Sequence, residues 1–198
     1  MKYIAVPVCL LMFYSVLCSQ NFIEDKRFGY SEAGSKPGEF NSPQAISISP
    51  NRIVYVVDTG NNRIQLFDLD GEFIKSVGGF GFTPDKFDRP VDIWVNSLIN
   101  IYISDYNNNR IQRYDGNMNF LSSLTSNDAA EERYQFEETG SCAINSQQDL
   151  FLLDCGDYKI IKYNRNSQPE RTIGDYESGY GQLIQAVQLE IVSQKYLT

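Results

Sequence analysis

The sequence has 198 residues, of which 42% are hydrophobic and 13% aromatic, and it carries a formal net charge of −8 with no histidine. This content is enough for a buried core and too apolar for a disordered chain. The negative charge argues against nucleic acid or an anionic membrane surface as a partner. Without histidine there is no Ser/His/Asp triad, histidine metal cage or imidazole base, and we expect no cofactor.

The first 18 residues have the pattern of a secretory signal peptide. Lys2 is their only charge, residues 4–17 form an uncharged apolar run, and a cleavage site is predicted before Ser19. The run is shorter than the roughly 20 residues of a transmembrane helix. We therefore expect a secreted or periplasmic protein with no membrane insertion. A lipid anchor on Cys18 is the alternative, and it fits less well because Leu17 stands where a bacterial lipoprotein has a small residue.

Residues 22–29 are predicted to form a short strand, and three repeat units follow them. The first unit contains DTGNNRIQLFD from Asp58, the second contains DYNNNRIQRYD from Asp105, and the third is a weaker copy around Asp154. In each unit, apolar residues alternate with polar ones over short runs bounded by turn residues, a pattern typical of strands. Four short strands in about 47 residues match the period of a propeller blade. The units span residues 43–78, 90–125 and 141–174.

The shared polar phrase is interpreted as a hairpin corner. Each aspartate ends a strand and is expected to accept hydrogen bonds from the backbone of the following turn. Gly60 or Asn107 can supply a positive φ there, and the arginine that follows has a carboxylate within reach. The asparagines of the phrase tolerate a positive φ as well, namely Asn61, Asn62, Asn108 and Asn109. A cation site is the alternative, but DTGNN lacks the carboxylate density of a calcium loop. The predicted structural turn residues are Asp58, Arg63, Asp105, Arg110, Asp154 and Lys159.

The segments 55–78 and 102–121 resemble the NHL repeat, in which an apolar strand ends in Asp and is followed by a Gly/Asn turn, Arg-Ile, a second strand and Asp-Gly. The resemblance implies a β-propeller, usually of six blades, with four-stranded antiparallel blades around a central channel. Residues 22–29 would then be the outermost strand of the closing blade, and residues 183–198 would begin a fourth blade. Because three blades and a fraction cannot close a ring, we expect a piece of a longer propeller; self-association is the alternative.

Two cysteines, Cys142 and Cys155, remain after removal of the leader. A turn at residues 146–149 would place Cys142 opposite Leu153 in a hairpin, with Cys155 on the diagonal, near the upper limit of disulfide reach. Two free thiols fit the sequence equally well. The sequence therefore leaves this pairing open.

We expect an exported, non-catalytic scaffold that recognises a protein, peptide or glycan through loops of the propeller. The alternative is a metal-dependent lactonase or hydrolase whose site lies partly in other blades. Relatives of that kind hold a metal with Glu, Asn and Asp in the channel, and no residue here can be matched to those ligands. Exposed Asn and Tyr side chains make adaptable contacts. The predicted binding face therefore consists of Asn61, Asn62, Tyr106, Asn108 and Asn109.

Overall fold

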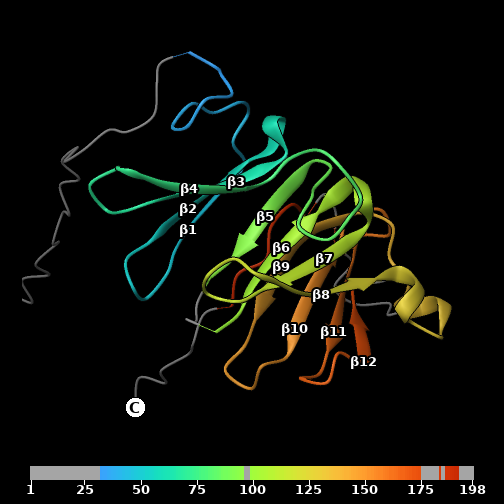
Figure 1. The fold of residues 1–198 in the computed structure, drawn as a ribbon. Helices are drawn as coiled ribbons and strands as arrows, with labels where there is room; N and C mark the ends of the chain where they lie inside the picture. The colour runs from blue at the N-terminus through green and yellow to red at the C-terminus, as the bar shows by residue number, and fades with distance from the viewer. Residues whose placement is uncertain (1–31, 96–98, 175–182, 184–185, 192–198) are drawn as a thin grey trace, which may run out of the picture.

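The computed structural model describes residues 32–95, 99–174, 183 and 186–191, and these residues form three four-stranded antiparallel sheets (Figure 1). Within each sheet the strands lie side by side in chain order. No α-helix occurs in the described ranges, and none of their helices is long and apolar enough to cross a membrane. The prediction of an all-β fold with four-stranded antiparallel blades is confirmed.

Each blade is a meander in which a tight turn links each strand to the next. Blade 1 consists of β1 (Ala45–Ile48), β2 (Val54–Asp58), β3 (Arg63–Phe67) and β4 (Phe73–Gly78). Blade 2 consists of β5 (Pro90–Trp94), β6 (Ile101–Asp105), β7 (Arg110–Tyr114) and β8 (Phe120–Thr125). Blade 3 consists of β9 (Thr139–Ile144), β10 (Leu150–Asp154), β11 (Lys159–Tyr163) and β12 (Pro169–Ile173). The 3-10 helices are η1 (Thr59–Asn61), η2 (Tyr106–Asn108), η3 (Ser126–Asp128) and η4 (Glu132–Tyr134).

The first strands of the blades contact one another, β1 with β5 and β5 with β9, so the blades fan outward from this line of strands (Figure 1). We call the face of a blade toward the preceding blade its rear face, and the opposite face its front face. Between blades 1 and 2, seam 1–2 is filled by apolar side chains that include Val57, Ile64 and Ile101. Seam 2–3 is filled by a second cluster that includes Leu152 and Tyr163. Burial of these faces is the main source of stability.

The rear face of blade 1 differs from the same face of the other blades. At equivalent positions, Ile46 and Ile48 of β1 are 64% and 56% exposed, whereas Ile93 and Val95 of blade 2 are 5% and 4% exposed. The register supports this equivalence, because Ile46 pairs with Val56 and Ile93 pairs with Ile103. In blade 3 the same positions hold Cys142 and Ile144, which are also buried. These two repeat positions are therefore core in blades 2 and 3 and surface in blade 1.

The hairpin corners place their positive φ on asparagines that the sequence named as tolerant of it. The positive φ falls on Asn62 (54°) and Asn109 (48°), the residues that follow η1 and η2, and not on Gly60 or Asn107. Asparagine tolerates this left-handed region at low cost because its short side chain can bond locally. Gly60 has a different role, since a Cβ atom there would lie 2.7 Å from the backbone oxygen of Asn41.

Gly60→Ala is therefore expected to destabilise the fold by about 1–3 kcal/mol, because its new methyl group collides with the linker before blade 1. The matched control is Asn107→Ala in blade 2, where the same position already carries a Cβ atom and the side chain makes an exposed hydrogen bond to Asp88. Urea denaturation measures both changes. Equal losses in the two variants would contradict the steric explanation.

The predicted register around Cys142 is wrong by one residue. Cys142 pairs with Leu152 and not with Leu153, because the turn begins one residue earlier, at Asn145. The Asn145 side chain closes this longer turn by accepting hydrogen bonds from the backbone N–H groups of Gln147 and Asp149. Both Cys142 and Cys155 are free thiols, so the disulfide that the sequence left open is not formed.

Several predicted segments lie outside the described residues. These are the signal peptide, the strand at 22–29 and most of the fourth unit at 183–198. The described residues of that unit, 183 and 186–191, form no strand. Instead the N–H of Leu189 donates to the hydroxyl oxygen of Ser141, at the first strand of blade 3 (3.0 Å).

Candidate functional site

The aspartate that ends β2 organises a buried network that holds the linker in front of blade 1. Asp58 Oδ2 accepts hydrogen bonds from Arg63 Nε (2.7 Å) and Gln65 Nε2 (3.1 Å). Its Oδ1 accepts the backbone N–H of Asn41 (2.7 Å). The arginine and glutamine also donate to the backbone oxygen of Glu39. The carboxylate thus fixes the preceding linker, and not the backbone of the following turn as the sequence had suggested.

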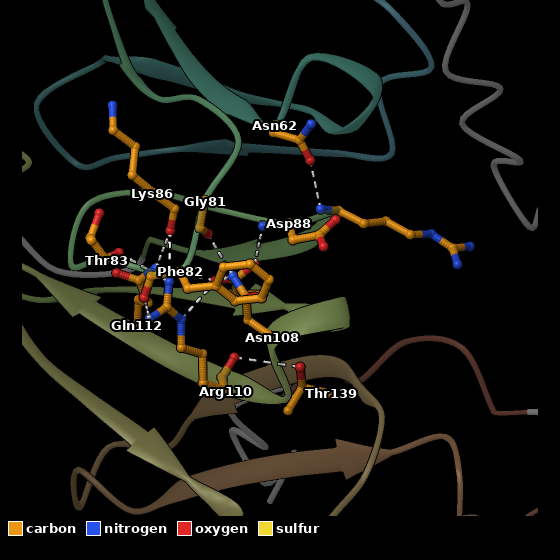
Figure 2. Close-up of polar contacts among 12 residues, drawn as sticks. Asn62, Gly81, Phe82, Thr83, Lys86, Asp88, Asn108, Arg110, Gln112 and Thr139 are labelled. Atoms are coloured by element: carbon orange, nitrogen blue, oxygen red, sulfur yellow. Dashed lines mark hydrogen bonds and ion pairs between the residues drawn. The ribbon is translucent and has the colours of Figure 1, made fainter.

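Blade 2 repeats this network almost atom for atom. Figure 2 shows Arg110 and Gln112 converging on Lys86. Arg110 Nε and Asp105 Oδ2 lie 2.8 Å apart, and both Arg110 Nη2 and Gln112 Nε2 donate to the backbone oxygen of Lys86. Burial raises the pKa of the Asp105 carboxyl, and hydrogen bonds from Asn108, the N–H of Asp88 and Arg110 oppose that rise. The ion pair has a structural role, because it positions Arg110 to hold the linker at Lys86 against blade 2.

In blade 3 the network is incomplete. Lys159 Nζ lies 3.8 Å from Asp154 Oδ2 and only 2.7 Å from Asp157. Ile161 occupies the position of the two glutamines. As a result, Asp154 Oδ2 is buried without a hydrogen-bond partner among the described residues, while its Oδ1 accepts the N–H groups of Glu138 and Gly156. Here the aspartate does accept a hydrogen bond from its own turn.

The predicted binding face is occupied largely by side chains that already serve the fold. Asn61 and Asn108 donate to the carbonyl oxygens of Gly34 and Gly81, and Asn62 Oδ1 accepts the N–H of Arg89 (Figure 2). The Tyr106 hydroxyl donates to Glu138 (2.6 Å), which raises the pKa of Tyr106 to about 12. Asn109 is exposed. The recognition role of these five residues remains a prediction.

The opposite edge of the blades opens into a cavity of about 490 Å³ in seam 2–3, which is lined by both polar and apolar side chains. Tyr102, Arg113 and Ser122 reach it from the front face of blade 2. Gln148 and Arg165 reach it from the two turns of blade 3 that join β9 to β10 and β11 to β12. The cavity therefore lies at the ends of the strands away from η1 and η2, at residues that the sequence alone did not single out.

The charged side chains that line this cavity are Arg113, Arg165 and Asp128. Arg113 Nε donates to Asn100 Oδ1 (2.9 Å), which holds the guanidinium at the wall. Burial raises the pKa of the neighbouring Tyr102 hydroxyl, while the positive charge of Arg113 opposes the rise. The carboxylate of Asp128 also lines the cavity, and it accepts hydrogen bonds from the N–H and hydroxyl of Thr125.

A cavity of about 450 Å³ occupies the related place in seam 1–2. It shares repeat positions with the first, since Tyr55, Ile99 and Gly116 stand where Tyr102, Gln148 and Arg165 stand. Its charged side chain is a carboxylate, Asp115. The two seams therefore offer cavities of similar size and opposite charge.

A third hollow, of about 240 Å³, lies beside the first strands of the blades and is lined in part by Asp92 of β5. Asp92 Oδ2 accepts hydrogen bonds from the Ser141 hydroxyl (2.5 Å) and the Cys142 N–H (3.1 Å), so it ties blade 2 to blade 3. Burial raises the pKa of this carboxyl. Within the described chain, no group of three or more His, Cys, Asp or Glu side chains could hold a metal ion.

Comparison with known families decides the identity of the fold. The family DUF5128, described as 6-bladed beta-propeller, matches residues 35–140, which is more than half of the chain. The chain belongs to this family. The propeller is of the NHL type, because 61 aligned residues are 41% identical to NHL repeat-containing protein 2 of Bos taurus, covering 26% of this chain and 8% of that protein.

Solved structures share the fold of this propeller. A protein described as exported from Bacteroides fragilis superposes with a TM-score of 0.58 at 14% identity, over 76% of this chain and 43% of its own. A streptogramin B lyase gives a TM-score of 0.54 at 16% identity, over 73% of this chain and 43% of its own. The chain thus spans less than half the length of either structure, and at these identities the likeness shows the fold alone.

Proposed function

We propose that this NHL-type propeller is an exported, non-catalytic binding module that takes its ligand at the cavity edge of seam 2–3. The apolar leader with Lys2 as its only charge supports export. A rigid β scaffold that presents polar groups in a concavity supports binding, and the candidate ligands are a protein segment, peptide or glycan. The observation that carries the proposal is the contrast between the two edges of the blades. At one edge, the side-chain amides of Asn61 and Asn108 are hydrogen-bonded to linker carbonyls. The other edge surrounds a cavity of about 490 Å³.

A blocking substitution tests this proposal. Ser167 lines the cavity with a φ of 59°, and Met118 holds the same repeat position in blade 2 with a φ of 60°. Ser167→Met should therefore be tolerated by the turn while its side chain fills the cavity. We expect the purified chain to bind members of a peptide and glycan array, and Ser167→Met to weaken that binding about tenfold or more.

Asn166→Met provides the matched control, because Asn166 is the exposed neighbour in the same turn. This control should bind as the parent does. Failure of the parent chain to bind any array member, or equal binding by both variants, would contradict the proposed function.

The alternative, a metal-dependent lactonase or hydrolase, is favoured by one observation. Asp92 is a buried carboxylate on a first strand of a blade, beside a hollow of about 240 Å³. Its bonds to Ser141 and Cys142 give it a structural role without any metal. The enzyme proposal requires lactone hydrolysis that depends on an added divalent metal and is lost in Asp92→Asn. Binding in the seam cavity without such hydrolysis would contradict it.

A further inference from the structure

Comparison of equivalent repeat positions in the two seams identifies the residues that make the seam 2–3 cavity differ from the core of seam 1–2. In seam 1–2, Leu66 and Met118 are buried in the apolar core. Arg113 and Ser167 occupy the same two repeat positions in seam 2–3, and both line the cavity. The repeat position of buried Leu66 therefore holds the half-buried Arg113 in seam 2–3. A guanidinium placed against a seam is costly unless it is paired or solvated.

Arg113 differs from Arg63 and Arg110, the arginines of the repeated turn phrase. Arg63 and Arg110 each form a close ion pair with an aspartate in their own blade. Among the described residues, Arg113 has one hydrogen bond, from Nε to Asn100, and no carboxylate within ion-pair distance. Arg113 lines the cavity, and its two terminal nitrogens have no hydrogen bond to the described residues, so their N–H donors are available to a ligand there. That planar pair of donors matches the two oxygens of a carboxylate.

The charge of the cavity selects the class of anion. Two guanidinium groups, Arg113 and Arg165, face one carboxylate, Asp128, which leaves one net positive charge. A monoanion neutralises that charge, whereas a phosphate monoester with nearly two negative charges would leave an excess. The rest of the lining includes Ser122 and Asn164, whose hydroxyl and amide groups can bond to ligand hydroxyls.

We propose that the seam 2–3 cavity binds a small hydroxylated monocarboxylate of the uronic acid type, with Arg113 holding the carboxylate. The proposal rests on the proposed function and names the ligand class of the same cavity. Its volume of about 490 Å³ falls in the range of about 300–1,000 Å³ typical of small-molecule sites. The cavity in seam 1–2, with Asp115 in its lining, should repel the same ligand.

Trp94 gives this binding a direct readout. It is the only tryptophan of the chain, and its ring packs edge-on against Tyr102 at 6.2 Å between centroids. Tyr102 in turn lines the cavity. We would titrate the purified full chain with sodium D-glucuronate, D-glucose and glucose 6-phosphate while recording tryptophan fluorescence and backbone amide NMR shifts. Glucuronate should bind about tenfold or more tightly than either of the other sugars.

Three variants make the test specific. Arg113→Leu, which installs the residue that blade 1 has at this position, should weaken glucuronate binding about tenfold or more while the chain stays folded. Arg113→Lys keeps the charge without the planar pair of donors and should give an intermediate loss. Arg89→Gln is the control, because Arg89 stacks on Tyr106 at the opposite edge of the blades. It should bind as the parent does.

Equal affinity for glucuronate and glucose, tighter binding of glucose 6-phosphate, or unchanged binding by Arg113→Leu would each overturn the proposal. Amide shifts confined to seam 1–2 would overturn it as well. The peptide and glycan array distinguishes failure of the carboxylate assignment from failure of the proposed function. A neutral ligand that binds in the cavity would refute the carboxylate assignment and leave the proposed function standing.

Discussion

Ile93→Glu is expected to destabilise the chain by at least about 4 kcal/mol, whereas Ile46→Glu at the same repeat position is expected to change stability by about 0.5 kcal/mol or less. Ile93 is 5% exposed in seam 1–2, so the substitution buries a carboxylate among apolar side chains. Ile46 is 64% exposed on the rear face of blade 1, so its carboxylate remains in water. Urea denaturation of both variants measures the difference.

If Ile93→Glu does not accumulate as a folded protein, Ile93→Ala provides a graded measurement, with an expected loss of about 2–4 kcal/mol. Ile46→Ala should again lie near the parent. A large loss at Ile46 would show that another surface already covers the rear face of blade 1, and would contradict the exposure described for β1.

The second large effect is expected at the aspartate networks. Asp105→Ala should cost about 3–5 kcal/mol, because it leaves the buried guanidinium of Arg110 without its partner. Asp154→Ala in blade 3 should cost less, about 1–3 kcal/mol, since Lys159 keeps its ion pair with Asp157 at 2.7 Å. Thermal and urea unfolding of the two variants under the same conditions test this order.

Asp105→Asn separates charge from shape in this network. The amide oxygen can still accept from Arg110, but the guanidinium loses its counter-charge, so an intermediate loss is expected. A loss at Asp154 equal to or greater than that at Asp105 would contradict the view that blade 3 carries a weakened copy of the linker tie.

The blade pattern was predictable from sequence because strand alternation and turn residues are local signals. The Asp–Arg phrase predicted the ion pairs, which lie at 2.7 and 2.8 Å. The role of Gln65 and Gln112 was missed, because each bonds to a linker 26 residues earlier in the chain. The RIQ triplet common to both copies was the available signal.

The cavity could not be found from the sequence alone. Arg113 looks like an ordinary polar residue of an alternating strand until the repeat position of Leu66 is known to be buried. The cysteine register failed for a different reason, because the Asn145 side chain lengthens the turn through local hydrogen bonds that strand alternation does not encode. The cavity depends on contacts between two blades, whereas the register depends on one turn.

The most direct test of the account is a crystal structure of the full chain soaked with sodium D-glucuronate. The account predicts the carboxylate within hydrogen-bonding distance of both terminal nitrogens of Arg113, with the sugar ring between the front face of blade 2 and the turns of blade 3. An Arg113 guanidinium paired with a protein carboxylate across a closed seam 2–3 would contradict it.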